Sequence, residues 1–342
     1  MIDLNKLVRE NVLRLTPYSC ARDEFSGREG IFLDANENPF GKLNRYPDPY
    51  QRELKQAIAQ LKETEPGRIF LGNGSDEIID LTFRIFCNPG KDKVMLFTPT
   101  YGMYSVSADI NDVGIISMPL DDNFQIDIAR VKPWLTHEDI KLIFICSPNN
   151  PTANSVKQTD IENILENFEG IMVIDEAYAD FSDSPSLMKL TKKYDNLVIM
   201  QTFSKAWGLA AARIGMAFST PEILSFYNKM KPPYNISSVN QEAVLDALND
   251  RDGFTSRLRM IKEEKKRLVT GLEKLGQVEK IYPSDANFLL VKVKDATEIY
   301  RKLIDKNIIV RNRSSLVNNC LRITVGKKNE NDALLKALKT IE

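Results

Sequence analysis

Histidine is almost missing from this sequence, since His137 is the only one among 342 residues. A Ser-His-Asp hydrolase, a Cys-His protease and a multi-histidine zinc site each need a histidine placed beside other reactive groups. His137 lies in the polar stretch WLTHED, which is typical of a solvated loop at the start of a helix. We therefore expect none of these chemistries and no metal site.

Cysteines and long apolar runs are also scarce. The four cysteines are scattered singly, without a CxxC pair, in a chain too large to need disulfides: Cys20, Cys87, Cys146 and Cys320. They indicate reduced thiols in the cytoplasm. The amino-terminal MIDLNKLVREN carries charges every few residues, and no stretch approaches ~18 apolar residues, so we expect neither a signal peptide nor a membrane span.

Charge of one sign is not in excess. Lys and Arg number 46 against 47 Asp and Glu, a formal net charge of -1, so we expect neither nucleic acid nor a membrane as a partner. With 43% hydrophobic and 27% charged residues, the chain has the composition of a globular protein. Its length suggests about two domains.

Six continuous apolar runs between residues 68 and 220 predict strands that are buried on both faces of a sheet. They are KVMLF (93–97), VGIISMPL (113–120), KLIFICSP (141–148), GIMVIDEA (170–177), NLVIMQTFS (196–204) and RIGMAFS (213–219). Helical patterns such as SDEIIDLTFRIF (75–86) lie between them. This order predicts an α/β fold with a mostly parallel central sheet covered by helices.

The pattern changes after the turn-rich KPPYNISS (231–238). A long charged amphipathic helix is expected over 254–275, with Gly276 as its stop. Strands are then expected at 287–293, 308–312 and 320–326, and helices around 295–306 and at the closing NENDALLKALKTIE. We expect three parts: an N-terminal segment (1–40) that packs on the small domain and the site, a large domain (41–240), and a small α/β C-terminal domain (241–342).

Polar clusters lie at the predicted carboxyl ends of strands, which is where doubly wound sheets bind ligands. They are Gly72–Glu77, Ser147–Thr152, Asp175–Tyr178 and Thr202–Lys205. Lys205 ends an apolar run, so its ammonium would be partly desolvated, its pKa lowered, and its neutral amine available to attack an aldehyde. Taken alone, Lys205 fits a solvated surface lysine better, as most lysines at strand ends are solvated.

Other groups in these clusters suit an aromatic ligand that carries a phosphate. Asp175 ends the run GIMVID, and a carboxylate there can hold a pyridinium nitrogen protonated, although it could also cap the next helix. Tyr178 could hydrogen-bond a ring oxygen. Arg213 suits a phosphate, which the free N–H groups of a helix starting near Ser75 would also attract. Further hydroxyl groups come from Thr202 and Ser204.

An ordered series of motifs covers nearly the whole chain. It runs LTPYSCARDEF, LDANENPFG, NRYPDP, GNGSDEIIDL, TPTYGMY, SPNNPT, IDEAYADF, TFSKAWGLAAARIG, ANFLLV, IIVRN and LRITVG. With these motifs the chain resembles the pyridoxal 5′-phosphate aminotransferases of fold type I, and among them the histidinol-phosphate aminotransferase family. The resemblance implies a three-layer sandwich with a smaller C-terminal domain. It also implies transfer of an amino group between histidinol phosphate or glutamate and imidazole acetol phosphate or 2-oxoglutarate, in histidine biosynthesis.

The resemblance implies a role around pyridoxal 5′-phosphate for each matched residue. Lys205 would bind the cofactor as a Schiff base and then move a proton between substrate and cofactor. Asp175 would pair with the pyridinium nitrogen, Asn150 and Tyr178 would hydrogen-bond the phenolic oxygen, and Tyr101 would stack on the ring. Lys205, Asp175 and Tyr178 form the expected catalytic set. The phosphate would be held by backbone groups of Gly74, Ser75 and Asp76, the hydroxyls of Thr202 and Ser204, and Arg213.

Substrate binding follows from the same resemblance. Arg322 would grip the carboxylate of amino and oxo acids and also the substrate phosphate. Arg311 and Tyr18 would assist it, and Asn36 would line the same pocket. Arg311 and Arg313 could instead be a pair of surface charges, and the sequence leaves the choice between them open.

The family pattern also implies a homodimer, because Tyr46 would reach the phosphate of the neighbouring subunit's cofactor. Two positions depart from that pattern: Ala153 and Ala211 stand where glycine is usual, and a residue other than glycine is disfavoured at positive φ. Two related activities on the same scaffold stay open, an aromatic or broad amino-acid aminotransferase and a threonine-phosphate decarboxylase. A non-catalytic effector domain is a third interpretation. The sequence argues against it, since we find no helix-turn-helix extension or basic segment.

Overall fold

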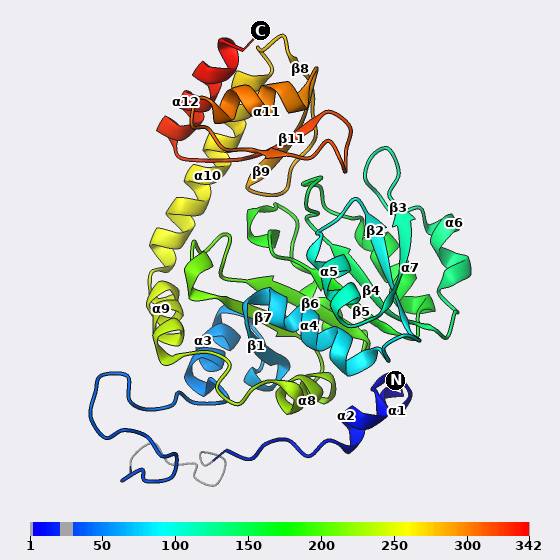
Figure 1. Cartoon of the computed structure of the whole chain (residues 1–342), viewed down its shortest axis with the longest axis vertical. Helices are drawn as coiled ribbons and strands as arrows, with labels where there is room; N and C mark the ends of the chain where they lie inside the picture. The colour runs from blue at the N-terminus through cyan, green and yellow to red at the C-terminus, as the bar shows by residue number, and fades with distance from the viewer. Residues whose placement is uncertain (1–2, 21–29, 342) are drawn as a thin grey trace.

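A seven-stranded sheet forms the centre of the molecule (Figure 1). The computed structural model describes residues 3–20 and 30–341. In sheet order the strands are β1 (Ile69–Asn73), β7 (Ile214–Phe218), β6 (Leu197–Thr202), β5 (Ile171–Asp175), β4 (Ile140–Cys146), β2 (Lys93–Thr98) and β3 (Gly114–Pro119). Neighbouring strands from β6 to β3 pair in parallel, while β7 is antiparallel to β1 and β6. The predicted mostly parallel sheet is confirmed.

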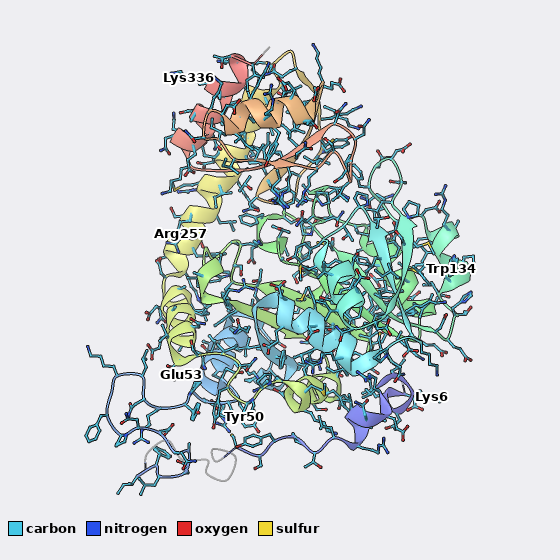
Figure 2. The ribbon with its side chains drawn as sticks, in the orientation of Figure 1. Lys6, Tyr50, Glu53, Trp134, Arg257 and Lys336 are labelled. Atoms are coloured by element: carbon cyan, nitrogen blue, oxygen red, sulfur yellow. The ribbon has the colours of Figure 1, made fainter. Side chains whose placement is uncertain are left out.

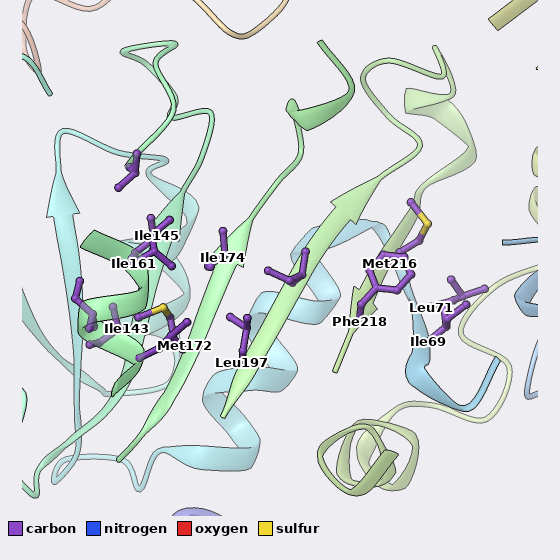
Figure 3. Close-up of a cluster of buried hydrophobic side chains, with 14 of the residues drawn as sticks. Ile69, Leu71, Ile143, Ile145, Ile161, Met172, Ile174, Leu197, Met216 and Phe218 are labelled. Atoms are coloured by element: carbon purple, nitrogen blue, oxygen red, sulfur yellow. The ribbon is translucent and has the colours of Figure 1, made fainter. Parts of the chain in front are cut away.

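Two apolar clusters, one on each face, bury this sheet. Successive residues of a strand point to opposite faces, so in β4 Ile143 and Ile145 lie in the first cluster whereas Leu142 and Phe144 lie in the second. Figure 3 shows part of the first cluster, with isoleucine and methionine side chains of neighbouring strands lying along one face. Because both faces are dry, the central strands are continuous apolar runs in the sequence.

Helices cover both faces, which gives the expected three layers. The first cluster is completed by α3 (Arg52–Lys62), α7 (Gln158–Asn167) and α9 (Ser238–Asn249), with the short α6 (Ile128–Val131) beside them. The second cluster is completed by α4 (Gly74–Phe86), α5 (Met103–Ile110) and α8 (Pro221–Met230). No helix within the described residues is long and apolar enough to cross a bilayer.

A second, antiparallel sheet lies at the other end of the molecule (Figure 1). Its strands, in order, are β10 (Arg311–Asn312), β11 (Cys320–Thr324), β9 (Phe288–Val293) and β8 (Val278–Ile281). The long α10 (Arg251–Leu272) runs from α9 to this sheet, and packs there with α11 (Ala296–Ile304) and α12 (Lys328–Lys339) around a separate apolar cluster.

Several elements differ from the sequence-based expectation for physical reasons. The predicted strands did not include β1 or β8. In β8 two exposed charged residues lie between two half-buried apolar ones, so it has no apolar run. β3 does have such a run, but only Met118 is buried in it, because β3 is an edge strand paired with β2 alone. α10 starts earlier than predicted, where the Asp250 side chain accepts the Gly253 N–H, and it ends before Gly276.

The described N-terminal residues belong to the large sheet's end of the molecule. α1 (Leu4–Leu7) and α2 (Glu10–Arg14) bury Leu7 and Val12 in the second cluster. Residues 30–46, the N-terminal arm, then extend outward at the end opposite the small sheet (Figure 1). Four apolar side chains of the arm are 72–92% exposed: Ile31, Leu33, Phe40 and Leu43. The remainder of the predicted segment 1–40, residues 1–2 and 21–29, lies outside the described residues.

Candidate functional site

Most of the predicted site residues lie where β4, β5 and β6 end beside the start of α4. Asp175 is the last residue of β5, Thr202 is the last of β6, and Lys205 follows three residues later. Asn150 follows β4, and Ser75 stands in the first turn of α4. The strands from β4 to β6 are parallel, so their carboxyl ends meet at one edge of the sheet.

Lys205 lies in surroundings that favour its neutral amine. Its pKa is lowered, first because the surrounding protein desolvates the ammonium and next because Arg322 repels it, while Asp175 acts in the opposite direction. The ammonium nitrogen lies 5.7 Å from the centroid of the Tyr178 ring. The side chain nevertheless keeps exposed surface, so a ligand can reach the amine.

Asp175 is a buried carboxylate with one hydrogen-bond donor on each oxygen. The Ala177 N–H donates to Oδ1 at 3.0 Å, and the Tyr104 hydroxyl donates to Oδ2 at 2.7 Å. Burial raises the pKa of Asp175 to about 6, and the two hydrogen bonds and Lys205 lower it again in part. The carboxylate is therefore still ionised at neutral pH, as pairing with a positively charged ring nitrogen would require.

Replacing Asp175 with asparagine is expected to stabilise the cofactor-free protein above neutral pH. The folded-state pKa of about 6 exceeds the ordinary value of 3.8, so the folded state binds the proton more tightly and stability falls as pH rises between these values. Asp175→Asn removes that loss, which is about 1–3 kcal/mol at pH ~8. Urea unfolding of both proteins at pH ~8 and ~4.5 measures it, and the difference should fall to about a third at the lower pH, because it disappears only below the ordinary pKa of 3.8. A variant that is less stable at pH ~8 would contradict this account of the buried charge.

The start of α4 and Arg213 form a surface suited to an anion. The Arg213 guanidinium pairs with Asp76 at 2.9 Å, and the Gly74 N–H donates to the Arg213 carbonyl at 2.7 Å. Gly74 has a φ of +73°, and a Cβ there would collide with that guanidinium. A Cβ on Gly215 would lie 2.5 Å from the Ser75 nitrogen. The side chain of the N-cap residue Asn73 does not bond to the first turn, which leaves the Ser75 and Asp76 N–H groups for an anion.

Thr202 and Ser204 connect this anion surface to the end of β6. The Thr202 hydroxyl lies 3.3 Å from the Ile214 carbonyl, to which it donates, and it accepts the Ser204 N–H at 3.1 Å. Ile214 directly follows Arg213 in the chain. These bonds fix the turn that carries Lys205 against the start of β7, directly after the arginine.

Two tyrosines of the TPTYGMY motif lie against the same cluster. The Tyr101 hydroxyl is 3.4 Å from Asp76 Oδ1, and burial, with Asp76 as the next cause, raises the pKa of Tyr101 to about 12. Its ring meets the Tyr104 ring edge-on, with centroids 5.5 Å apart. Sequence reasoning missed Tyr104, which is fully buried and donates to Asp175. Tyr104 could have been found from its spacing, because it follows Tyr101 by three residues at the start of a helix, which places the two rings on the same side.

Arg322 reaches from the small sheet to the large one. Its Nη1 donates to Asn150 Oδ1 at 2.6 Å, so a predicted substrate residue and a predicted cofactor residue contact each other. The guanidinium carbon lies 5.3 Å from the centroid of the Phe288 ring, which in turn meets Tyr178 edge-on at 5.1 Å. Burial lowers the pKa of Arg322, and Tyr178 partly opposes this. Phe288, in the ANFLLV motif, was also missed as a site residue.

Two further arginines lie near Arg322. Arg311 pairs with Arg322 across β10 and β11 and is exposed. Arg313 is half-buried, and its Nε is buried without a hydrogen-bond partner. Burial lowers the pKa of Arg313, with repulsion from Arg322 and then Arg311 as the next causes. Three cations thus lie together, an arrangement suited to an anionic substrate.

Three predicted residues do not join this cluster within the single chain. Tyr18 is 76% exposed, and Asn36 is exposed on the N-terminal arm with a φ of +54°. Tyr46, at the end of the arm, is 51% exposed and stacks on Tyr234 with ring centroids 4.4 Å apart. Because the arm extends away from the small sheet (Figure 1), the roles of these residues stay predictions that need a second subunit.

Ala153 has a φ of +70°, a backbone conformation that is unfavourable for residues other than glycine. Its side chain is fully buried beside Tyr178. Replacement by glycine relieves ~1–2 kcal/mol of backbone strain. It also destabilises the folded protein by ~0.4–1 kcal/mol, because the unfolded chain gains entropy, and by a further ~0.8 kcal/mol, because a buried methyl group is lost. We therefore expect Ala153→Gly to be nearly neutral and Ala153→Val, which adds β-branching and volume, to destabilise by about 2–4 kcal/mol. Urea unfolding of both variants checks this. An Ala153→Val variant as stable as the unaltered protein would show that the turn relaxes.

The single histidine lies away from the site. His137 is exposed and stacks on Trp134 with ring centroids 5.1 Å apart. Figure 2 shows Trp134 at the outer edge of the large sheet's layer, beside α6. The expectation that His137 is a surface residue is confirmed.

Comparison with known proteins gives one consistent family. The model of the family described as aminotransferase class I and II matches residues 28–338. A histidinol-phosphate aminotransferase of Bacteroides thetaiotaomicron is 50% identical over 343 residues, covering 99% of both chains. The crystal structure of the histidinol-phosphate aminotransferase from Clostridium acetobutylicum is similar, with a TM-score of 0.80 and 25% identity over 87% of this chain and 91% of that one.

A second similar solved structure is that of a complex with a ligand. It is the histidinol-phosphate aminotransferase from Sinorhizobium meliloti in complex with pyridoxal-5'-phosphate, with a TM-score of 0.78 and 24% identity over 87% of this chain and 83% of that one. At this identity the likeness shows the fold. Together with the family match over most of the chain and the near-complete coverage of the relatives, these findings show that the protein belongs to the class I and II aminotransferase family.

Proposed function

We propose that this protein is a pyridoxal 5′-phosphate-dependent histidinol-phosphate aminotransferase, which exchanges an amino group between histidinol phosphate and glutamate and their oxo counterparts in histidine biosynthesis. The observation that carries the proposal is that Lys205 lies close enough to two arginines, Arg213 and Arg322, for both to repel its ammonium. Arg213 pairs with Asp76 at the start of α4, and Arg322 comes from the small sheet and donates to Asn150. An amine near two arginines from different parts of the fold suits a cofactor phosphate at one arginine and a substrate anion at the other.

The described residues fit the proposed cofactor. Gly74 at the start of α4 and Gly215 in β7 let Arg213 and the first turn of α4 approach closely, at the place where helix N–H groups and Arg213 favour a phosphate. Asp175 supplies a buried negative charge for the ring nitrogen. When bound, pyridoxal 5′-phosphate supplies an aldehyde that takes up amino groups and a ring that withdraws electrons.

The chain's own residues would then orient the reaction and move the proton. Lys205 Nζ would act as the base and acid, because its lowered pKa makes the neutral amine available. Asp175 would hold the charge on the ring nitrogen, Tyr101 would cover the ring, and Asn150 and Tyr178 would donate to the ring oxygen. Phe288 and the central strands are buried, so they would keep water from that side of the site.

Substrate anions would be held by the arginines of the small sheet. Arg322 would bind a carboxylate or phosphate, for which a guanidinium group is suited. The hydrogen bond from its guanidinium to Asn150 holds it beside the proposed cofactor site. Arg311 remains the proposed assistant, together with Tyr18 and Asn36. Arg313 is the other candidate, since its buried Nε lacks a partner.

A homodimer is part of the proposal. The apolar side chains of the N-terminal arm are exposed in the single chain, and exposed apolar surface of this kind is typical of an interface. A partner subunit would cover them and would bring Tyr46 to the neighbouring site. The division into residues 1–40, 41–240 and 241–342, and a location in the cytoplasm, are proposed with it.

An assay of three amino donors tests the proposed function. Purified protein with added cofactor is supplied with 2-oxoglutarate and either histidinol phosphate, phenylalanine or threonine phosphate, and glutamate formation is followed. We expect the kcat/KM for histidinol phosphate to exceed the others by about 10-fold or more, because phenylalanine lacks the phosphate and threonine phosphate lacks an aromatic ring. A preference for phenylalanine, or release of carbon dioxide from threonine phosphate, would replace the proposal with the corresponding related activity.

A further inference from the structure

Tyr104 is placed to control the Asp175 carboxylate without contacting a ligand itself. It is 0% exposed, and its hydroxyl donates to Asp175 Oδ2 at 2.7 Å. The other oxygen, Oδ1, is held by the Ala177 backbone N–H at 3.0 Å. With one donor on each side, the carboxylate plane is fixed, and further lone pairs remain for a third donor such as a protonated ring nitrogen.

The Tyr104 ring is itself held on two sides. Phe144 of β4 stacks on it, with centroids 4.9 Å apart and an interplanar angle of 24°. Tyr101, whose ring is expected to face the cofactor, meets it edge-on at 5.5 Å. The direction of the hydroxyl is therefore set by packing, which is what a group that orients another residue requires.

The energetic need for such a donor is large. Asp175 is 3% exposed, and a buried carboxylate without donors is strongly disfavoured in its charged form. The other titratable groups around it are Lys205, Asp76, Cys146, Tyr101 and Tyr178, and of these only Lys205 favours the negative charge. Burial keeps the pKa of Tyr104 well above its ordinary value, so the hydroxyl stays a donor at any working pH.

We propose that Tyr104 is a positioning residue of this site, whose buried hydroxyl holds the Asp175 carboxylate charged and correctly turned for a positively charged ring nitrogen. The proposal rests on the proposed function for the identity of that ring. The hydroxyl acts through Asp175, so it affects cofactor affinity and the protonation of Asp175 before any reaction takes place.

The test compares Tyr104→Phe with Tyr227→Phe. Tyr227 is a matched control: it is also fully buried, and its hydroxyl bonds with Thr82 at 2.7 Å, on α4 and away from Asp175. Thr82 keeps a second bond, to the Ile78 carbonyl, when that hydroxyl is removed. Pyridoxal 5′-phosphate affinity is measured by titration of cofactor-free full-length protein. Carbon-13 NMR of labelled aspartate follows the Asp175 pKa in the same cofactor-free protein, with Asp175→Asn identifying its resonance.

We expect Tyr104→Phe to weaken cofactor binding by about 10- to 100-fold, as for loss of a hydrogen bond to a charged group. The Asp175 titration should move to higher pH, while Tyr227→Phe changes neither quantity. An unchanged affinity and titration in Tyr104→Phe would overturn the inference, and so would equal effects of the two variants, since these would indicate a general packing defect. If the unaltered protein failed to bind the cofactor, the proposed function would fail instead, while the NMR titration would still decide whether Tyr104 controls Asp175.

Discussion

Lys205→Ala is expected to lower the aminotransferase rate by at least about 10³-fold and to remove the visible absorbance of protein-bound cofactor. The side chain is proposed both as the amine that binds the cofactor aldehyde and as the group that carries the proton, and acid-base catalysis alone contributes about 10²- to 10⁴-fold. Its surroundings are arranged for this, because burial and Arg322 lower its pKa. Spectra and steady-state rates of the variant measure both effects.

Lys132→Ala provides the control for this prediction. Lys132 is exposed and lies two residues before Trp134, which Figure 2 shows at the outer edge of the large sheet's layer, so its loss should change neither rate nor spectrum. Cofactor that stays covalently attached to the Lys205→Ala protein after borohydride reduction would mean that another lysine binds it.

The second large effect is expected at Arg322. Arg322→Ala should raise the KM for both glutamate and histidinol phosphate by about 10- to 100-fold, which corresponds to the ~1.5–3 kcal/mol of a hydrogen bond to a charged group. It also removes a positive charge that lowers the pKa of Lys205, so the pH dependence of the bound-cofactor spectrum should move to higher pH. Steady-state kinetics with each substrate and a spectral pH titration test the two parts separately.

Arg301→Ala serves as the matched arginine control. Arg301 lies on α11, which packs on the small sheet, and its exposed side chain pairs with Glu298 at 2.9 Å. An exposed pair of this kind contributes little to stability. If the kinetics for both substrates were unchanged in Arg322→Ala, the anion site would lie elsewhere. Arg313 would then be the next residue to replace.

The sheet was predictable because its central strands are buried on both faces. Runs such as KLIFIC and GIMVID can only be continuous when both faces are dry, and the structure places them as β4 and β5. The direction of β7 was not predictable, since an antiparallel strand buried on both faces has the same apolar run as a parallel one. β8 was missed because its exposed polar residues remove the pattern.

The candidate site was predictable where residues follow strand ends. Lys205, Asp175 and Asn150 each end or follow a strand, so the meeting of those ends at one edge of the sheet brings them together. Tyr104 and Phe288 could not be assigned this way, because both act through packing and through bonds to other side chains. The contact between Arg322 and Asn150 depends on how the small sheet sits on the large one, which no local pattern encodes.

The most direct test of the central claim is to locate the cofactor on the chain. Purified protein is incubated with pyridoxal 5′-phosphate, reduced with borohydride, digested and mapped by mass spectrometry. The account predicts one cofactor per chain, attached to the peptide that contains Lys205 and absent from that peptide in Lys205→Ala. No attached cofactor, or attachment at another lysine in the unaltered protein, would contradict it.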